Sequence, residues 1–407
     1  MTLHAPTRRE LLLGSGAFFA WAYLPKLARA EGRDPRLLVM VLRGALDGLA
    51  AVAPVADPAW PSLRGDKGLG GATAGLPLNS YFALNPAMPN LHRLYQSGAA
   101  TLVHAVATPY RERSHFDGQD VLESGYGGPG TAESGWLNRA LLALQPDGRA
   151  TGANAFAVGP IAPLVVRGPA PVLSWAPRRL PPAGQDTLMR LLDLYRHSDA
   201  PLARALEERV GLAKIAAAAG MDGQQPRAAE IAQVRAYFAE AASAAARFLA
   251  RTDGPRVGAL AFDGWDTHAD EGPVSGRLAA LLGSLDGAIA AIENELRDAW
   301  RDSVVLVITE FGRTARINGT EGTDHGTATV AFLAGGALKG GRVIADWPGL
   351  TSPNLHDGRD LKPTTDLRAV LKGVLKDHLR VDEAVLASKV FPDSGRVKPM
   401  RDLLAHA

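Results

Sequence analysis

The segment Arg36-Leu-Leu-Val-Met-Val-Leu-Arg-Gly-Ala-Leu-Asp-Gly48 decides the fold class of this chain. Its first part is a short, mostly apolar run, which is typical of a parallel strand buried on both faces. Its second part combines glycine with Arg43 and Asp47, which is typical of a polar loop at the end of a strand. The same order of apolar run and polar loop recurs along the chain.

Further apolar runs and helical patterns alternate after this segment. Strands are predicted at 99–106, 155–158, 257–262, 303–309 and 328–333, and helices at 86–96, 116–124, 186–196, 201–218, 227–251, 276–301 and 366–379. Such alternation predicts a three-layer α/β/α sandwich with a mostly parallel central sheet. We expect a single α/β domain over residues 31–407, in which residues 184–251 form a helical insertion.

The N-terminal segment has a different character. Residues 7–30 read TRRELLLGSGAFFAWAYLPKLARA, in which Arg8 and Arg9 precede a short apolar stretch and Ala28-Arg29-Ala30 matches a cleavage site. The apolar stretch is too short to span a bilayer. We therefore predict a twin-arginine signal peptide at residues 1–30, export by the Tat machinery to the periplasm or the medium, and no membrane span in the mature chain.

Composition and charge exclude several classes of protein. The chain has 46% hydrophobic and 21% charged residues, as globular proteins have. Its formal charge of +2 comes from the signal segment, which carries four basic side chains and one acidic side chain, so that the mature chain is near −1. The mature chain has no stripe of basic residues that would indicate a nucleic-acid partner. Because the chain has no Cys, disulfides and thiolate-bound iron–sulfur clusters are excluded, which disfavours an exported redox subunit.

Polar side chains gather where the predicted strands end. In open α/β sheets, ligands bind at the carboxyl ends of the strands. The residues concerned are Asp47 after the first strand, Arg113, Ser114, His115 and Asp117 after the second, Asp266 and His268 after 257–262, Glu310 and Arg313 after 303–309, and Asp324 and His325 just before 328–333. Carboxylates and imidazoles suit one or two divalent cations, without distinguishing Zn, Mn, Mg or Ca.

Three arginines and one serine could act on an anionic substrate at this edge. Arg43, Arg113 and Arg313 can each hold an oxyanion through two hydrogen bonds. The Ser114 hydroxyl, at the start of a predicted helix, would ionise more readily beside a helix dipole and a metal ion. Each cluster also has a structural interpretation: Ser114 can cap the helix, and Glu310 with Arg313 can form a surface ion pair.

Several motifs in order resemble those of the exported bacterial "domain of unknown function 1501" family. They are Leu42–Gly48, Arg113–Asp117, Gly135–Arg139, Gly264–His268, Thr309–Thr314, Gly322–Gly326 and Asp360–Arg368, and they cover nearly the whole mature chain. That family resembles the alkaline phosphatase/sulfatase superfamily, whose α/β/α sandwich carries a bimetal site at the strand ends. The resemblance implies a nucleophile at Ser114.

The same resemblance implies a ligand set. It assigns metal binding to Asp47, Asp266, His268, Glu310 and His325, with Asp324 as a further ligand or as a support for His325. Phe311 stands where the superfamily has a metal-binding His, so one ligand is missing, and His115 or Asp117 is a candidate replacement.

Two functions follow from these expectations. The first is an exported metal-dependent hydrolase of phosphate or sulfate esters, acting on a small anionic ester or on a sulfated or phosphorylated glycan. The alternative is a non-catalytic, sulfatase-like scaffold that binds an envelope glycan or a protein partner, and the ligand missing at Phe311 favours it.

Overall fold

The first predicted strand lies at the centre of the molecule. In the computed structural model, β1 (Arg36–Arg43) pairs with β8 on one side and with β9 on the other, and both pairs are parallel. The structure describes residues 33–70, 75–130, 132–145, 155–177, 185–198, 202–204, 207 and 226–405. The predicted signal peptide and most of the predicted helix 201–218 lie outside these residues.

The described residues form a central sheet of nine strands: eight follow the order β11-β5-β10-β9-β1-β8-β6-β7, and β12 pairs with β5. Among the described strands of this sheet, only β10 runs antiparallel to its neighbours, so the sheet is mostly parallel, as predicted. The other strands are β5 (Ala100–Ala107), β6 (Ala155–Val158), β7 (Val172–Trp175), β8 (Val257–Asp263), β9 (Ser303–Thr309), β10 (Thr329–Ala334), β11 (Arg342–Ile344) and β12 (Thr365–Asp366).

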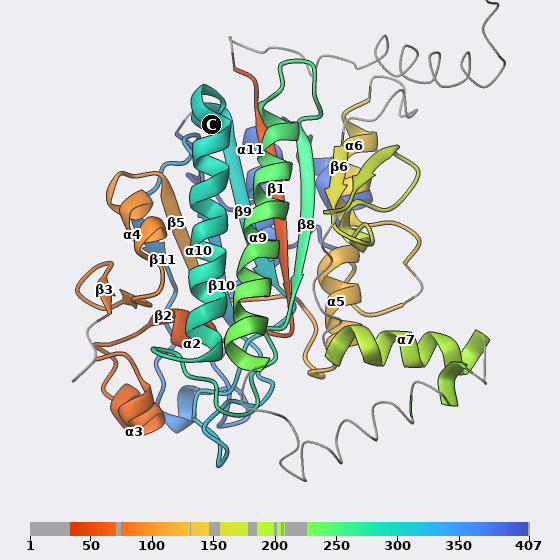
Figure 1. Cartoon of the computed structure of the whole chain (residues 1–407). Helices are drawn as coiled ribbons and strands as arrows, with labels where there is room; N and C mark the ends of the chain where they lie inside the picture. Colours follow the sequence, from red (N-terminus) through yellow and green to blue (C-terminus); the bar gives the residue numbers. More distant parts are fainter. Residues whose placement is uncertain are drawn as a thin grey trace, which may run out of the picture.

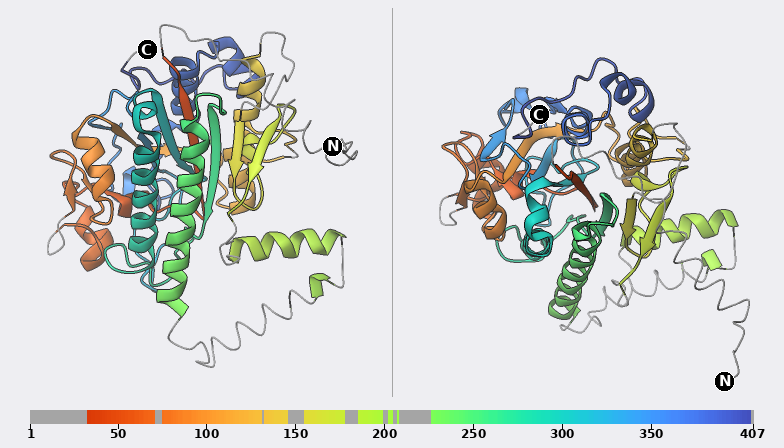
Figure 2. Two further views of the ribbon diagram at one scale, coloured as in Figure 1. Left: turned by 45° about the horizontal axis from the view of Figure 1, so that its top comes forward. Right: turned by 90° about the horizontal axis from the view of Figure 1, so that it is seen from above.

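Helices cover both faces of this sheet (Figures 1 and 2). Along β1, Leu38, Met40 and Leu42 pack into one hydrophobic cluster, whereas alternate residues such as Val39 pack into the other. The first face carries α4 (Pro89–Gln96), α9 (Pro226–Ala250) and α10 (Arg277–Leu296), and the second carries α5 (His115–Ser124), α6 (Trp136–Ala143) and α11 (Leu367–Leu379). The predicted three-layer α/β/α sandwich is thus confirmed.

The described part of the segment 184–251 includes two long helices in different settings. α9 packs against α10 in the helix layer, and Phe238 stacks on Phe262 of β8. α7 (Gln185–Ser198) instead projects from the lower right of the molecule in Figure 1. No helix of the described residues has the length and apolar character needed to cross a membrane.

Short elements lie between the predicted ones. The chain forms α2 (Gly48–Ala51), α3 (Trp60–Arg64) and α12 (Glu383–Val385), and a second sheet of β2 (Val52–Ala53), β3 (Leu76–Pro77) and β4 (Ala83–Leu84). These elements are too short to produce a periodic sequence pattern. They matter for function because α2 and α3 determine what surrounds Asp47.

Candidate metal centre

The sheet topology brings the predicted site residues to one edge. β1, β8 and β9 are parallel, so Arg43, Asp263 and Thr309 end at the same edge, the lower one in Figure 1. β10 begins at this edge because it runs antiparallel, and its first residue, Thr329, pairs with Val106 near the end of β5. This is why His325, which precedes a strand, meets residues that follow strands.

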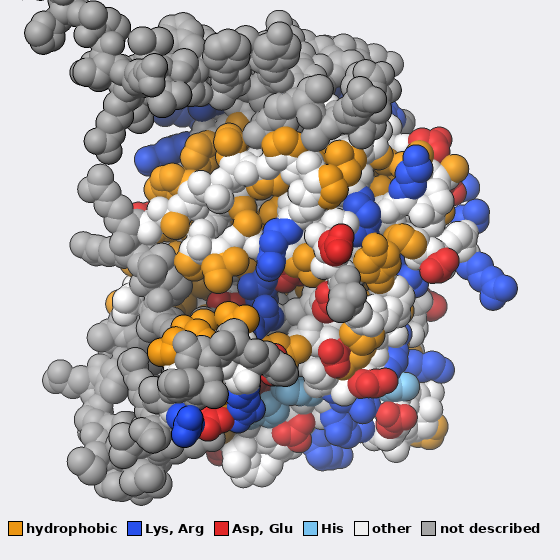
Figure 3. All heavy atoms as spheres, turned by 90° about the vertical axis from the view of Figure 1, so that its right-hand side faces the viewer, with side chains coloured by type: hydrophobic (Ala, Val, Ile, Leu, Met, Phe, Trp, Pro, Cys, Tyr) orange, Lys and Arg blue, Asp and Glu red, His pale blue; other side chains and the backbone are white. Residues whose placement is uncertain are grey.

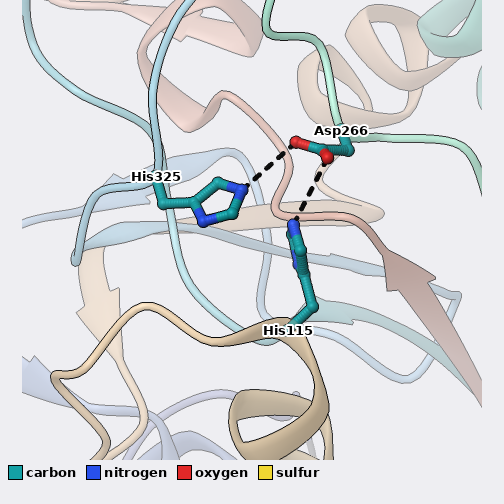
Figure 4. Close-up of side chains that lie close together, drawn as sticks. All are labelled: His115, Asp266 and His325. Atoms are coloured by element: carbon teal, nitrogen blue, oxygen red, sulfur yellow. Dashed lines mark ion pairs between the residues drawn. The ribbon is translucent and has the colours of Figure 1, made fainter. Parts of the chain in front are cut away.

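Three of these side chains form a compact group. His115, Asp266 and His325 offer ligand atoms that all lie within 4.8 Å of one another (Figure 4). His115 Nε2 lies 3.5 Å from Asp266 Oδ2, and His325 Nε2 lies 3.4 Å from Asp266 Oδ1. His115 opens α5, Asp266 follows β8, and His325 precedes β10, so three separate elements build the group.

His268 adds a third imidazole. Its Nε2 lies 3.1 Å from Asp266 Oδ1 and 2.9 Å from His325 Nε2. The Asp266 side chain is 37% exposed and that of His268 is 47% exposed, so the group opens to solvent on this side. Three Nε2 atoms therefore converge on one carboxylate.

The other nitrogen of each ring faces a hydrogen-bond acceptor. His115 Nδ1 lies 2.9 Å from Glu310 Oε1, His325 Nδ1 lies 2.9 Å from the Arg113 carbonyl, and His268 Nδ1 lies 3.5 Å from an Asp324 carboxylate oxygen. An imidazole that donates from Nδ1 keeps its Nε2 lone pair free, which is the usual arrangement of a metal-binding histidine. His115 Nε2 is buried and has no hydrogen-bond partner among the described residues.

The contacts of Asp266 with the imidazoles have lengths close to those between neighbouring ligands of one small cation. Zinc bonds of 2.0–2.1 Å in a tetrahedral site place ligand atoms about 3.3 Å apart. The contacts of Asp266 with the three imidazoles are 3.1 to 3.5 Å. Nitrogen and oxygen donors of this kind suit zinc and related transition metals.

Strong electrostatic coupling ties the group together. Burial would lower the pKa of His115, but its contacts with the carboxylates of Asp266 and Glu310 outweigh burial and raise it to about 9. Burial would raise the pKa of Asp266, yet contacts with His115, His325 and Arg313 hold it well below its usual range. Burial and the charge of Arg313 lower the pKa of His268.

Arg313 fixes the carboxylate at the centre. Its Nη1 donates to Asp266 Oδ1 at 2.6 Å and its Nε donates to Thr323 Oγ1 at 3.1 Å, while its Nη2 donates to the Thr323 carbonyl. The side chain is fully buried. The guanidinium is thus engaged by protein groups, and it orients Asp266.

Glu310 faces the protein on all sides. Its Oε1 accepts from the Gly44 N–H at 2.8 Å and from Gln119 Nε2 at 3.0 Å as well as from His115, and its Oε2 accepts from Thr309 Oγ1 at 2.8 Å. Phe311 stacks on the His115 ring at 5.1 Å. Both residues therefore position His115 in this structure.

Asp47 lies apart from the three imidazoles. It is fully buried, accepts from the Ala50 N–H at the start of α2, and receives two hydrogen bonds of 2.5 and 3.1 Å from Arg64. Its sequence position after β1 correctly places it at the edge of the sheet. The structure gives its carboxylate an arginine partner from α3, which no sequence pattern indicated.

Ser114 directly precedes His115 at the cap position of α5, although its side chain caps no backbone N–H. The Tyr110 hydroxyl accepts from the Ser114 N–H at 3.1 Å and donates to Asp117 Oδ2 at 3.3 Å. Among the described residues, no hydrogen bond joins the Ser114 hydroxyl to the three imidazoles or Asp266. The Arg113 side chain pairs with Asp357 and Asp360 at 2.9 and 2.7 Å.

Two supporting residues were absent from the sequence-based set. Gln119 stands one turn after His115 on α5, a spacing that could have indicated a shared partner. Glu271 is buried, accepts from Thr267 Oγ1 at 2.8 Å, and lies 3.5 Å from Thr323 Oγ1. Burial and the charge of Asp47 raise the pKa of Glu271 to about 8. It lies in the loop after the predicted strand 257–262, but farther from the strand end than Asp266 and His268, so strand ends alone could not identify it.

Several solved structures are similar to this chain. The PsFucS1 sulfatase from a Pseudoalteromonas species is 13% identical, with a TM-score of 0.44 over 98% of this chain and 77% of the sulfatase. A putative sulfatase from Bacteroides thetaiotaomicron is 12% identical, with a TM-score of 0.39 over 91% of this chain and 76% of the other. The phosphonate monoester hydrolase of Agrobacterium radiobacter is 11% identical, with a TM-score of 0.36 over 85% and 74%, respectively. Comparison with curated proteins finds no match.

A family profile matches the chain directly. The family is described as "Protein of unknown function (DUF1501)", and the match spans residues 94–390, well over half of the chain. This region includes His115, Asp266, His268 and His325, whereas Asp47 precedes it. The chain therefore belongs to the DUF1501 family, as the order of its motifs predicts.

Proposed function

We propose that this protein is an exported, metal-dependent hydrolase of phosphate or sulfate esters. The observation that carries the proposal is the convergence of His115, His268 and His325 on Asp266 at the carboxyl edge of the sheet. The Nδ1 atom of each imidazole faces a hydrogen-bond acceptor. The group is exposed to solvent at Asp266 and His268. A bound divalent cation would supply Lewis-acid activation of an ester oxygen.

The chain's own groups have distinct parts in this proposal. His115, Asp266 and His325 would hold the cation, with His268 beside them, and Arg313 and Glu310 orient Asp266 and His115. The Ser114 oxygen attacks phosphorus or sulfur, the bond to the leaving alcohol breaks, and water later cleaves the serine ester. Tyr110, whose hydroxyl accepts from the Ser114 N–H and donates to Asp117, would pass the serine proton to the Asp117 carboxylate, and the departing alkoxide would take a proton from water.

Export belongs to the same proposal. The twin-arginine signal at residues 1–30 would direct the folded protein through the Tat machinery to the periplasm or the medium. A hydrolase there would meet small anionic esters and sulfated or phosphorylated glycans. A fusion of residues 1–30 to a Tat-dependent reporter, with Arg8 and Arg9 both replaced by Lys as the control, tests this part.

Metal content and turnover test the catalytic part together. We expect elemental analysis of the purified protein to find close to one or two divalent ions per chain, and Asp266→Ala to lose them. Asp298→Ala, an exposed acidic residue in another part of the molecule, is the matched control and should retain them. Hydrolysis of 4-nitrophenyl phosphate or 4-nitrophenyl sulfate should disappear in Asp266→Ala and in Ser114→Ala. A metal-free wild-type protein that hydrolyses neither ester would exclude the proposal.

One observation favours the second candidate function, a non-catalytic scaffold that binds an envelope glycan or a protein partner. Asp47 and Glu310 are both bonded to protein groups, so Asp266 is the one predicted carboxylate that faces all three imidazoles in the described structure. A protein with full metal occupancy and no turnover across a panel of phosphate and sulfate esters would support this second function.

A further inference from the structure

A cavity of about 670 Å³ adjoins the candidate metal centre. The loop after β8 connects the two: Gly264 and Ala269 line the cavity, and Asp266 and His268, which lie between them in sequence, belong to the metal centre. The volume falls in the range of small-molecule binding sites, which is about 300–1,000 Å³. A ligand in this cavity would therefore lie beside the loop that carries Asp266 and His268.

Much of the cavity wall is apolar. The residues concerned come from α7, α9, α10 and the end of β6, and they include Val158, Ile161, Leu194, Tyr237, Phe238 and Leu281. Ile161 is 73% exposed and Leu194 is 57% exposed, which is unusual for large aliphatic side chains that border a cavity. An apolar ligand surface placed here would remove both from water.

The remaining wall carries an excess of positive charge. Five basic residues line the cavity against three acidic ones, Asp263, Asp270 and Glu321. Arg43 is paired with Glu123 and Lys67 with Glu321, each at 2.6 Å. In Figure 3, Lys and Arg side chains stand among hydrophobic ones on this side of the molecule, with His side chains below them.

Two arginines of this wall have no ion-pair partner within the described part of the chain. Arg277 opens α10 and donates to the Gly264 carbonyl at 3.1 Å, whereas Arg167 is exposed after the loop that follows β6. A guanidinium can hold a sulfate, phosphate or carboxylate group through paired hydrogen bonds. Each of these side chains therefore offers a partner for an anionic group at the cavity wall.

We propose that the cavity binds an amphiphilic anion with an aromatic or branched aliphatic body and a negatively charged group held by Arg167 and Arg277. We assign this anion as the leaving group of a substrate cleaved at the metal centre, and this assignment rests on the proposed hydrolase function. The aliphatic wall disfavours a sugar ring, because buried hydroxyls need many polar partners. The substrate class is thus an ester of an apolar alcohol, with a second anionic group, rather than a glycan.

Binding of 2-naphthalenesulfonate, measured by calorimetry in EDTA, tests this inference without metal or turnover, because its carbon–sulfur bond is not an ester. We expect a Kd at least about tenfold lower than those of inorganic sulfate and of neutral 2-naphthalenemethanol. Arg167→Ala and Arg277→Ala should each weaken binding about tenfold, and Ile161→Ser about threefold. Arg396→Ala, an exposed arginine outside the cavity wall, is the matched control and should bind like the wild type.

The possible results separate this inference from the proposed function. Equal affinity for the sulfonate and the neutral alcohol, or for the sulfonate and sulfate, would overturn it, as would unchanged binding in both arginine variants. Ester turnover without sulfonate binding would overturn the inference and leave the hydrolase intact. Sulfonate binding to a protein that holds no metal and hydrolyses no ester would support the cavity and exclude the hydrolase.

Discussion

Asp47 and Asp266 occupy similar places in the fold and have opposite environments. Each follows a central parallel strand at the same edge of the sheet, β1 for Asp47 and β8 for Asp266. Asp47 is completely buried against the guanidinium of Arg64, whereas the Asp266 side chain is 37% exposed and meets three imidazoles. Position at a strand end brings a carboxylate to the edge, but the neighbouring segments decide what it can bind.

The difference comes from short helices that follow β1. α2 uses Asp47 as its N-terminal cap, and α3 delivers Arg64, which also donates to the carbonyls of Thr314 and Ala315. No such helix covers Asp266, whose strand is followed by an irregular loop. Arg64 engages both carboxylate oxygens of Asp47, and freeing such a buried pair for a metal is costly. Asp266 is also paired with a buried arginine, Arg313, but only through Oδ1, and its Oδ2 faces His115.

The largest expected effect on stability concerns the buried carboxylate, Asp47. Arg64→Met should lower the free energy of unfolding by about 3–5 kcal/mol, because it leaves the charge of Asp47 buried without a partner. Denaturation in urea measures this loss. The double variant Asp47→Leu/Arg64→Met should recover much of it, because neither charge remains. A loss below about 1 kcal/mol in the single variant would show that Asp47 is solvated, and the comparison would fail.

At the solvent-exposed group around Asp266, the pH should change the stability of the protein through His115. Its pKa is near 6.5 in the unfolded chain and about 9 in the folded chain, so the folded state binds this proton more tightly. The resulting stabilisation is fully present below pH 6.5 and is lost as the pH rises through 9. The shift corresponds to about 3 kcal/mol. Because a metal displaces this proton, metal affinity should also rise with pH over the same range.

Denaturation of the metal-free protein at pH 6 and at pH 9.5 measures the effect of His115. The wild type should lose about 3 kcal/mol more than His115→Gln between these two values. An equal loss in both proteins would mean that Glu310 and Asp266 do not hold the proton on His115. Proton release on metal addition at pH 7 gives an independent measurement.

The two carboxylates also show which features of the fold and the site could be predicted from the sequence alone. The apolar run at 36–42 and the helix patterns predicted the sandwich, because a strand buried on both faces has a nearly continuous apolar sequence. The sequence of β10 does not indicate that this strand runs antiparallel, although His325 was predicted to reach the same edge. Pairing of Asp47 with Arg64, and of Glu310 with Gln119, depends on side-chain directions that periodicity does not encode. The predicted roles of Ser114, Arg113 and the ligand residues stay predictions.

A smaller effect is expected from the third imidazole. His268 is the most exposed of the three imidazoles, with 47% of its side chain exposed against 14% for His115 and 24% for His325. His268→Ala should therefore weaken metal binding by only about tenfold, whereas His325→Ala should abolish it. Metal titration by calorimetry measures both, and His92→Ala, a histidine on α4, is the control. Equal losses in the two variants would place His268 fully within the ligand set.

The smallest effect should come from Asp324, an acidic residue beside the open site. Its side chain is 55% exposed and reaches His268 Nδ1 at 3.5 Å, and it also accepts from Asn318 Nδ2 at 3.1 Å. Exposed pairs of this kind contribute about 0–1 kcal/mol. Asp324→Asn should therefore change metal affinity by less than about threefold and leave unfolding nearly unchanged, in contrast to Arg64→Met. A tenfold or larger loss would show that Asp324 binds the metal itself. The open site would then extend from Asp266 across His268 to a second carboxylate, and its contrast with the closed Asp47 site would become sharper.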